Sequence, residues 1–206
     1  MGKKLTARQI MESEDFKRCE AFHGHVCGGL AIGYVAARAG LDWLRENRAL
    51  DEELVAIVET DACCVDAIQV LTGCTFGKGN LIYRDYGKMG FTFFNRHTGQ
   101  GVRLAMIPDT FRVNERQIEL FEKTRDGSIT DAEAAELESL GTQRTAEVLD
   151  TRAEELFSMT PVTAGMPDKA RIEPSKPCAR CGEPTMASKL ASMDGQAVCR
   201  GCLAEA

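Results

Sequence analysis

The stretch AFHGHVCGGLAIGYVAA, residues 21–37, decides how the first half of this chain folds. It places two of the chain's three histidines and one cysteine within five positions, directly before an apolar run. From Leu30 to Leu44 that run has apolar residues at helical spacing and many alanines, which predicts a largely buried helix. Cys27 then stands near the helix N-terminus, where the helix dipole and free N–H groups favour a thiolate. One interpretation is therefore a metal site or a reactive thiol at the start of a core helix.

His23, His25 and Cys27 alternate along the chain just before this helix. In an extended segment all three side chains point to one face, whereas in a helix only positions 23 and 27 share a face. Both conformations bring at least one histidine to the cysteine. The structural alternative is a buried cysteine beside two solvent-facing histidines, and this stretch alone does not decide between the two.

A second cysteine cluster, CCVDAIQVLTG at 63–73, begins a short helix that its final glycine closes. Adjacent side chains point different ways, so we expect one of the two cysteines to face a site and the other to pack. We assign Cys64 to the site as a thiolate ligand beside Cys27. Asp66 is expected to be an acid of the first helical turn rather than a catalytic group. The assignment requires the two helices to pack with their N-termini close together.

The loop that follows, GCTFGKGN at 73–80, is rich in glycine, which allows the backbone to approach a ligand closely. It lacks the spacing and the terminal Ser/Thr of a Walker loop. Lys78 offers a mobile cation for an anionic ligand and is a candidate catalytic residue together with Cys27 and Cys64. The pocket residues predicted here are Cys74, Gly77, Lys78 and Asn80. A helix from Cys64 to Cys74 is roughly 15 Å long, so these two thiols are not expected to share one ion within one protomer.

The rest of the first 160 residues predicts an α+β core, with helices packed on an antiparallel meander. ELVAIVET at 53–60 has the length and composition of a strand. The segments LIYRDY, GFTFFNR and VRLAMIP, at 81–86, 90–96 and 102–108, are rich in β-branched and aromatic residues and are joined by turn-forming sequences. Helices are expected at 114–125 and at 130–158, the second starting with a capping box of Thr130 and Glu133.

Four cysteines near the C-terminus predict a zinc ribbon. CARC at 178–181 and CRGC at 199–202 are two C-x2-C knuckles separated by 17 residues, a spacing that lets four thiolates surround one tetrahedral ion. The expected ligands of this structural zinc are Cys178, Cys181, Cys199 and Cys202. Two redox dithiols or an iron–sulfur site are the alternatives. We therefore divide the chain into a core domain at 1–160, a proline-containing linker at 161–175 and a zinc ribbon at 176–206.

Composition narrows the partners and the compartment. A net charge of −6 argues against broad binding to nucleic acid or to an anionic membrane. Residues 168–206 carry six Lys/Arg against five Asp/Glu, so the ribbon is expected to contact protein or stabilise a dimer rather than bind nucleic acid. The N-terminus has no signal-peptide pattern and no run is apolar enough for a membrane helix. Nine cysteines in a chain expected to be cytoplasmic favour metals or catalysis over disulfides.

The segments FHGHVCGGLAIGYVAA (22–37) and CCVDAIQVLTGCTFGKGNL (63–81) together resemble the E-subunit family of formylmethanofuran dehydrogenase. The resemblance covers roughly residues 10–160, and several forms in that family carry a C-terminal zinc ribbon. It implies an α+β core, an intertwined homodimer and a cysteine- and histidine-lined cavity that can hold a metal. It also implies association with the molybdenum- or tungsten-dependent enzyme that fixes carbon dioxide onto methanofuran. Where the family usually has proline after the first cysteine, this chain has Gly28, which loosens the turn and removes no ligand.

These observations predict a metal-binding accessory or small-molecule-handling protein with a ligand cavity in its core. Its core site would combine Cys27 and Cys64 with His23 or His25 and a water molecule, a mixed sulfur–nitrogen set that suits zinc. No segment resembles a molybdopterin-binding or ferredoxin-like protein, so the chain is not expected to run the dehydrogenase reaction alone. Two other functions stay open: a zinc-ribbon regulator or scaffold that contacts protein or DNA, and a stand-alone thiol or metal enzyme that uses Cys27 with a histidine base.

Overall fold

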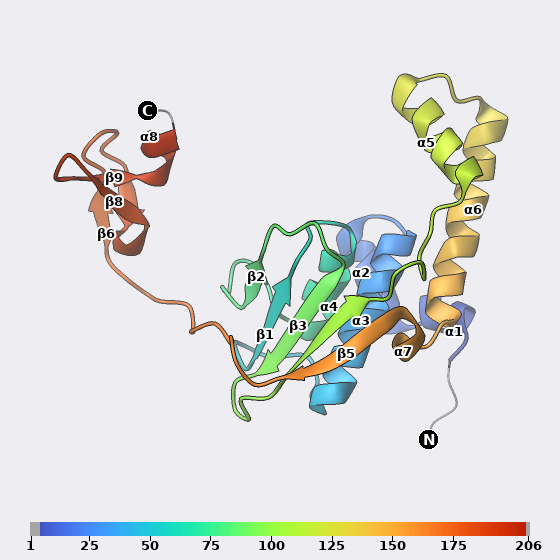
Figure 1. The fold of residues 1–206 in the computed structure, drawn as a ribbon, viewed down its shortest axis with the longest axis horizontal. Coiled ribbons are helices and arrows are strands. Elements are labelled where there is room, and N and C mark those ends of the chain that lie inside the picture. Colours follow the sequence, from blue (N-terminus) through green and yellow to red (C-terminus); the bar gives the residue numbers. More distant parts are fainter. Residues whose placement is uncertain (1–4, 205–206) are drawn as a thin grey trace. The chain divides into compact units, whose positions relative to one another are not determined.

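The computed structural model describes residues 5–204, and the chain divides into two compact units between Lys169 and Ala170 (Figure 1). The larger unit contains a five-stranded sheet with helices packed behind it in this view, and the smaller unit contains two short hairpins. The predicted α+β class is confirmed. Within residues 5–204, no helix combines the length and the apolar character that crossing a bilayer needs.

The N-terminal helices follow the capping residues of the sequence. Ser13 caps α2 by accepting a hydrogen bond from the amide of Phe16, and Gly24, at φ 93°, ends that helix in the left-handed conformation. The chain then turns within three residues, and the sulfur of Cys27 caps α3 by accepting from the amide of Leu30. The four helices of this region are α1 (Ala7–Met11), α2 (Glu14–His23), α3 (Gly28–Leu44) and α4 (Cys64–Thr72).

The sheet has the strand order β2-β1-β3-β4-β5. Its strands are β1 (Leu54–Val58), β2 (Leu81–Tyr83), β3 (Gly90–Asn95), β4 (Gly101–Met106) and β5 (Phe157–Val162). The expected continuous meander is wrong at one end, because β2 pairs with β1 in parallel and not with β3. A parallel pair needs a crossover, and α4 supplies it. All five residues of β1 are buried, as expected for a strand inside the sheet.

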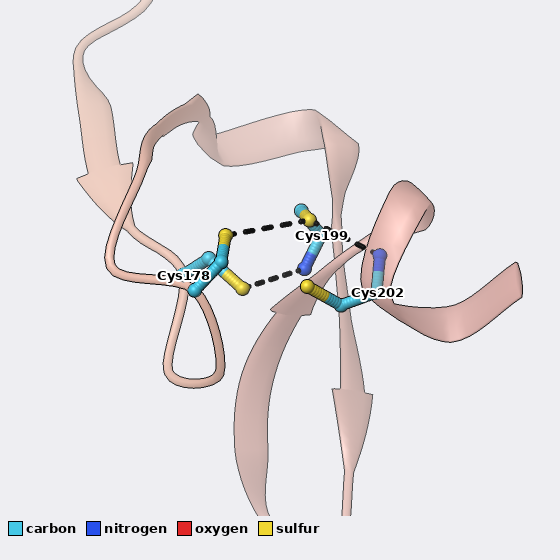
Figure 2. A group of neighbouring side chains, drawn as sticks. Cys178, Cys199 and Cys202 are labelled. Carbon is cyan, nitrogen blue, oxygen red and sulfur yellow. Dashed lines mark hydrogen bonds between the residues drawn. The ribbon is translucent and has the colours of Figure 1, made fainter. Parts of the chain in front are cut away.

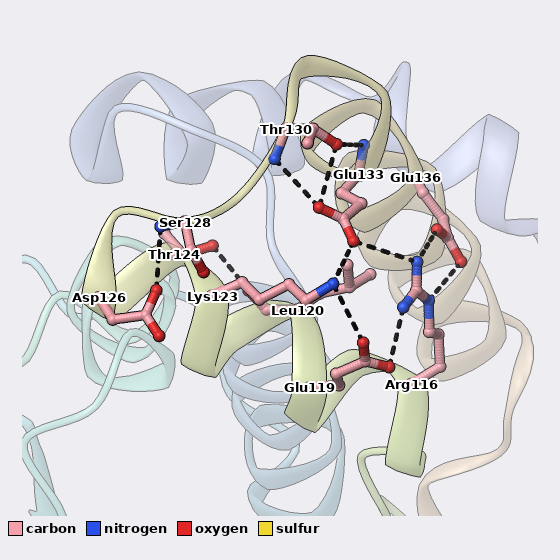
Figure 3. A network of polar contacts seen from close by, with 10 residues as sticks. All are labelled: Arg116, Glu119, Leu120, Lys123, Thr124, Asp126, Ser128, Thr130, Glu133 and Glu136. Atoms are coloured by element: carbon pink, nitrogen blue, oxygen red, sulfur yellow. Dashed lines mark hydrogen bonds and ion pairs between the residues drawn. The ribbon is translucent and has the colours of Figure 1, made fainter.

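Helices α5 (Glu115–Asp126) and α6 (Asp131–Asp150) form a hairpin that extends away from the sheet (Figure 1). The predicted capping box of Thr130 and Glu133 is present at the start of α6. An ionic network joins the two helices (Figure 3): Arg116 contacts Glu136 at 2.6 Å, and Lys123 contacts Glu133. The hairpin is thus held together largely by polar contacts.

The long helix predicted at 130–158 is wrong at its C-terminal end. Helix α6 stops at Asp150, a short helix α7 (Ala153–Leu156) follows, and residues 157–162 become the edge strand β5. Phe157 is 1% exposed and packs edge-to-face on Phe91 of β3. Burial of this aromatic side chain in the sheet outweighs the helical preference of the preceding alanine- and glutamate-rich segment.

The larger unit also extends beyond the predicted boundary at residue 160. The edge strand continues to Val162, and Met166 packs on a second small cluster formed by Val55, Ile57 and Phe94. Arg96 then donates a hydrogen bond of 2.7 Å to the carbonyl of Pro167. The first half of the predicted linker therefore covers the sheet.

The smaller unit is built from short elements. They are β6 (Ser175–Pro177), β7 (Pro184–Met186), the 3-10 turn Ala187–Lys189, β8 (Leu190–Met193), β9 (Gln196–Cys199) and α8 (Arg200–Ala204). The pairs β6-β7 and β8-β9 are antiparallel hairpins. Among residues 170–204 only Cys178 and Val198 are buried, so an apolar core does not explain this fold.

Candidate metal centres

The ligand atoms of His23, His25 and Cys27 all lie within 4.8 Å of one another, at the junction of α2 and α3. The Cys27 sulfur is 3.8 Å from Nε2 of His23. Two ligands of a tetrahedral zinc, with bonds of about 2.0 Å to nitrogen and 2.3 Å to sulfur, are separated by about 3.6 Å. The tight turn at Gly24 and the capping position of Cys27 therefore bring a sulfur and imidazole nitrogens to metal-binding distance.

Asp66 fixes the orientation of His23. Its Oδ2 lies 2.7 Å from Nδ1 of the imidazole, and the His23 side chain is only 10% exposed. A hydrogen bond from Nδ1–H to this carboxylate leaves Nε2 free to face Cys27. Asp66 lies in the first turn of α4, as expected, but its contact with His23 was not expected. One signal was in the sequence, since Asp66 is three residues after Cys63 and so shares a helix face with it.

Cys63, and not the predicted Cys64, lies beside Cys27. A Cβ atom placed on Gly29 would lie 3.7 Å from the sulfur of Cys63 and 3.8 Å from that of Cys27. Burial and the nearby Cys27 raise the pKa of Cys63. The two thiols therefore flank the start of α3.

Cys64 turns into the core, and the assignment of this residue as a ligand or catalytic thiol is corrected. Its sulfur contacts the carbonyl of Ala62 at 3.7 Å and the sulfur of Met89 at 3.9 Å. Burial raises its pKa to about 12, which keeps it a neutral thiol. The expected packing of the two helices is nevertheless present, because the backbone of Cys64 lies directly against Gly33 of α3.

The loop at 73–80 is not brought to this site. Lys78 donates to the carbonyl of Asp51, and the side chain of Asn80 binds the carbonyls of Asp51 and Leu54. These contacts lie at the beginning of β1, at the other end of α4, which is about 13 Å long. The predicted pocket and catalytic residues of this loop, Cys74, Gly77, Lys78 and Asn80, therefore have a structural role. Burial also raises the pKa of Cys74 to about 11.

Two cavities border the group of His23, His25 and Cys27. The first, which we call the hairpin cavity, has a volume of about 710 Å³ and lies between the start of α3 and the α5–α6 hairpin, with His25 and Cys27 in its wall. The second has a volume of about 420 Å³ and is lined by His23, Cys63 and Asp66, among others. Both sizes suit water or small molecules, so the group can be reached from either side.

The four C-terminal cysteines converge as predicted, with their sulfur atoms within 4.8 Å of one another. Backbone amides point at the sulfurs, as Figure 2 shows for the amides of Cys199 and Cys202. Hydrogen bonds from the amides of Cys181, Cys199 and Arg180 lower the pKa of Cys178 to about 6. Four sulfurs with no open position fit a structural metal ion rather than a catalytic one.

Comparison with known proteins gives two sequence matches. The FmdE family, described as "FmdE, Molybdenum formylmethanofuran dehydrogenase operon", matches residues 22–158, a range that includes His23, Cys27 and Asp66. A protein of Archaeoglobus fulgidus, described as a probable S-adenosyl-L-methionine-binding protein, is 32% identical over 182 residues. The match covers 84% of this chain and 49% of that protein, so the chain spans about half the length of this curated relative.

A solved structure shares the fold. It is the crystal structure of an FmdE-like protein of the tungsten formylmethanofuran dehydrogenase type from Syntrophus aciditrophicus, with a TM-score of 0.60 and 22% sequence identity. The comparison covers 100% of this chain and 98% of that one.

Proposed function

The chain belongs to the FmdE family, and on that premise we propose that it is a zinc-binding accessory or small-molecule-handling protein. The observation that carries the proposal is the group of His23, His25 and Cys27, with Asp66 holding the imidazole of His23. Three protein ligands leave one position of a tetrahedral ion for water or substrate, which is the pattern of a working zinc site rather than a structural one. Zinc bound there would supply Lewis-acid chemistry at the open position.

The residues around the group support this assignment. Two imidazoles and one thiolate are a donor set that zinc accepts well. The carboxylate of Asp66 orients one ligand, and Cys63 places a further sulfur beside Cys27. The adjoining cavities give a small molecule access to the open position. In the ribbon, a second zinc would be structural.

Metal analysis of anaerobically purified protein tests the proposal. We expect two zinc ions per chain in the wild type, about one in Cys27→Ser and about one in Cys178→Ser, because each variant loses a ligand from a different site. The two variants serve as controls for each other. If Cys27→Ser retains as much metal as the wild type, the core site is not a metal centre.

A thiol enzyme is the second candidate function, and one observation favours it. Asp66, His23 and Cys27 form a carboxylate–imidazole–thiol series, with 2.7 Å between the first two side chains and 3.8 Å between the last two. In such a series the histidine acts as the base that activates the thiol. If metal-free protein reacts rapidly with iodoacetamide at Cys27 and slowly in His23→Ala, while purified protein holds metal only in the ribbon, this second function replaces the first.

The partners remain predictions. We expect a homodimer, which light scattering would test, and an association with the other chains of a molybdenum or tungsten enzyme, which co-purification would test. The description of the Archaeoglobus fulgidus protein makes S-adenosyl-L-methionine a ligand worth testing. Since this chain spans about half of that protein, the part that binds the ligand there can lie outside the shared region.

A further inference from the structure

One guanidinium in the hairpin cavity has donors without acceptors. Arg144 of α6 is the one Lys or Arg among the described residues that line this cavity. Its Nε and Nη2 are buried and have no hydrogen-bond partner within the described chain. Its Nη1 lies 3.7 Å from a carboxylate oxygen of Glu147, whose side chain is 51% exposed. Buried donors of this kind are normally satisfied, so the site lacks an acceptor.

Phe111 holds this guanidinium next to the metal group. The Cζ of Arg144 lies 4.4 Å from the centre of the Phe111 ring, a stacking distance typical of arginine on an aromatic face. A Cβ atom placed on Gly28 would come within 2.9 Å of the Phe111 ring and 3.8 Å of Arg144 Cγ. The missing side chain at Gly28 therefore makes room for Phe111 and Arg144 beside Cys27.

The rest of the cavity wall is mixed. Val113, Phe121 and Leu137 add apolar surface, and the volume of about 710 Å³ is that of a small-molecule site. Glu20 and Glu138 are also in the wall, but Glu138 is exposed and Glu20 is partly exposed, so solvent screens their charges. Arg144 is the cation held by packing inside the cavity.

We propose that the hairpin cavity binds a small molecule that carries an oxyanion and an apolar portion. Arg144 receives the oxyanion, because a guanidinium matches the planar oxygens of a carboxylate or the oxygens of a phosphate with two parallel hydrogen bonds. Phe111 and Phe121 receive the apolar portion. This inference names the ligand class of the proposed metal site, and it relies on the proposed function only for the metal that lies beside the ligand.

Calorimetric titration of the full-length, zinc-loaded protein tests this with three probes: phenylacetate, phenyl phosphate and the neutral phenylacetamide. We expect at least one anionic probe to bind more tightly than phenylacetamide, and to bind at least tenfold more weakly to Arg144→Gln. Which anion binds better distinguishes carboxylate from phosphate ligands. Affinity for phenylacetamide should change little, since it does not use the charge.

The controls separate charge, packing and metal. Arg144→Lys keeps the charge without the planar fork and should lose part of the affinity, which also provides a variant if Arg144→Gln does not fold. Arg152→Gln removes an exposed arginine outside this cavity and should bind like the wild type. Equal affinity of wild type and both Arg144 variants, or no anionic binding to the wild type, overturns the inference. Normal zinc content with no anionic binding leaves the proposed function intact.

Discussion

At the scale of single residues, the contact between Asp66 and His23 does the most to define the core site. The two side chains come from different helices, α4 and α2, and meet at 2.7 Å on a nearly buried imidazole. The carboxylate selects the tautomer with hydrogen on Nδ1, so the lone pair on Nε2 faces Cys27. Without it the ring is free to rotate, and the metal would have to order it on binding.

Removing this contact should therefore weaken metal binding without unfolding the protein. We expect Asp66→Asn to lower zinc affinity at the core site about tenfold and Asp66→Ala up to about 100-fold, the range found for such supporting partners. Asn retains an oxygen acceptor but no charge, which explains the order. Competition with a chromophoric chelator measures both. Asp61→Asn, an exposed carboxylate in the wall of the same second cavity, is the matched control and should bind like the wild type.

The same scale shows why Cys63 and Cys64 were exchanged in the sequence-based prediction. Moving one residue along a helix rotates the side chain by about 100°, so a small error in where α4 starts changes which cysteine faces α3. His23, His25 and Cys27 were identified because they are close together in the sequence. Asp66 and Arg144 reach the site through packing of distant helices, which residue spacing does not encode.

At the scale of elements, the close approach of α3 and α4 positions the site. A Cβ atom placed on Gly33 would lie 2.0 Å from the carbonyl oxygen of Cys64. Only glycine permits this contact, and the contact brings the start of α4, with Cys63 and Asp66, to the start of α3. A single backbone-to-backbone approach thus sets the distance between the two halves of the site.

An alanine at this contact should force the helices apart. We expect Gly33→Ala to lower the free energy of unfolding by about 2–3 kcal/mol, since a rigid backbone atom has to move. Gly141→Ala adds the same atoms to another helix, where nothing lies within 4 Å, and should raise stability by about 0.5–1 kcal/mol. Urea denaturation of both variants gives the comparison. Equal stability of Gly33→Ala and wild type would contradict the packing described here.

Element existence was more predictable than element pairing. Ser13, Gly73 and the Thr130–Glu133 capping box mark helix ends in the sequence, and the structure has helix ends there. The parallel pairing of β2 with β1 was missed because local turn signals favoured a simple meander. The strand at 157–162 was missed because helical propensity extends past Asp150, whereas burial of Phe157 decides the conformation.

At the scale of the whole molecule, the two units are stabilised in different ways. The larger unit buries a continuous set of apolar side chains between its helices and its sheet. The smaller unit buries Cys178 and Val198 among its described residues, which is far too little to offset the entropy of ordering about 30 residues. Its four converging cysteines were predictable from spacing alone, because metal-binding knuckles are local in sequence.

The ribbon should consequently unfold when one of its ligands is removed, while the larger unit stays folded. Cys178 accepts hydrogen bonds from the amides of Arg180 and Cys199, so its sulfur joins the two hairpins as well as binding metal. In Cys178→Ser we expect amide resonances of residues 175–204 to move to random-coil positions, since structural zinc supplies roughly 10–16 kcal/mol in comparable small domains.

The unfolding midpoint of the larger unit should stay within about 1 °C of the wild-type value, because its own apolar core is unchanged. Cys27→Ser is the reciprocal control: it should lose the core metal and leave the ribbon resonances dispersed. A lower midpoint for the larger unit in Cys178→Ser would contradict this independence. It would mean that the ribbon contributes contacts to the stability of the core, so that the metal in one unit supports the fold of the other.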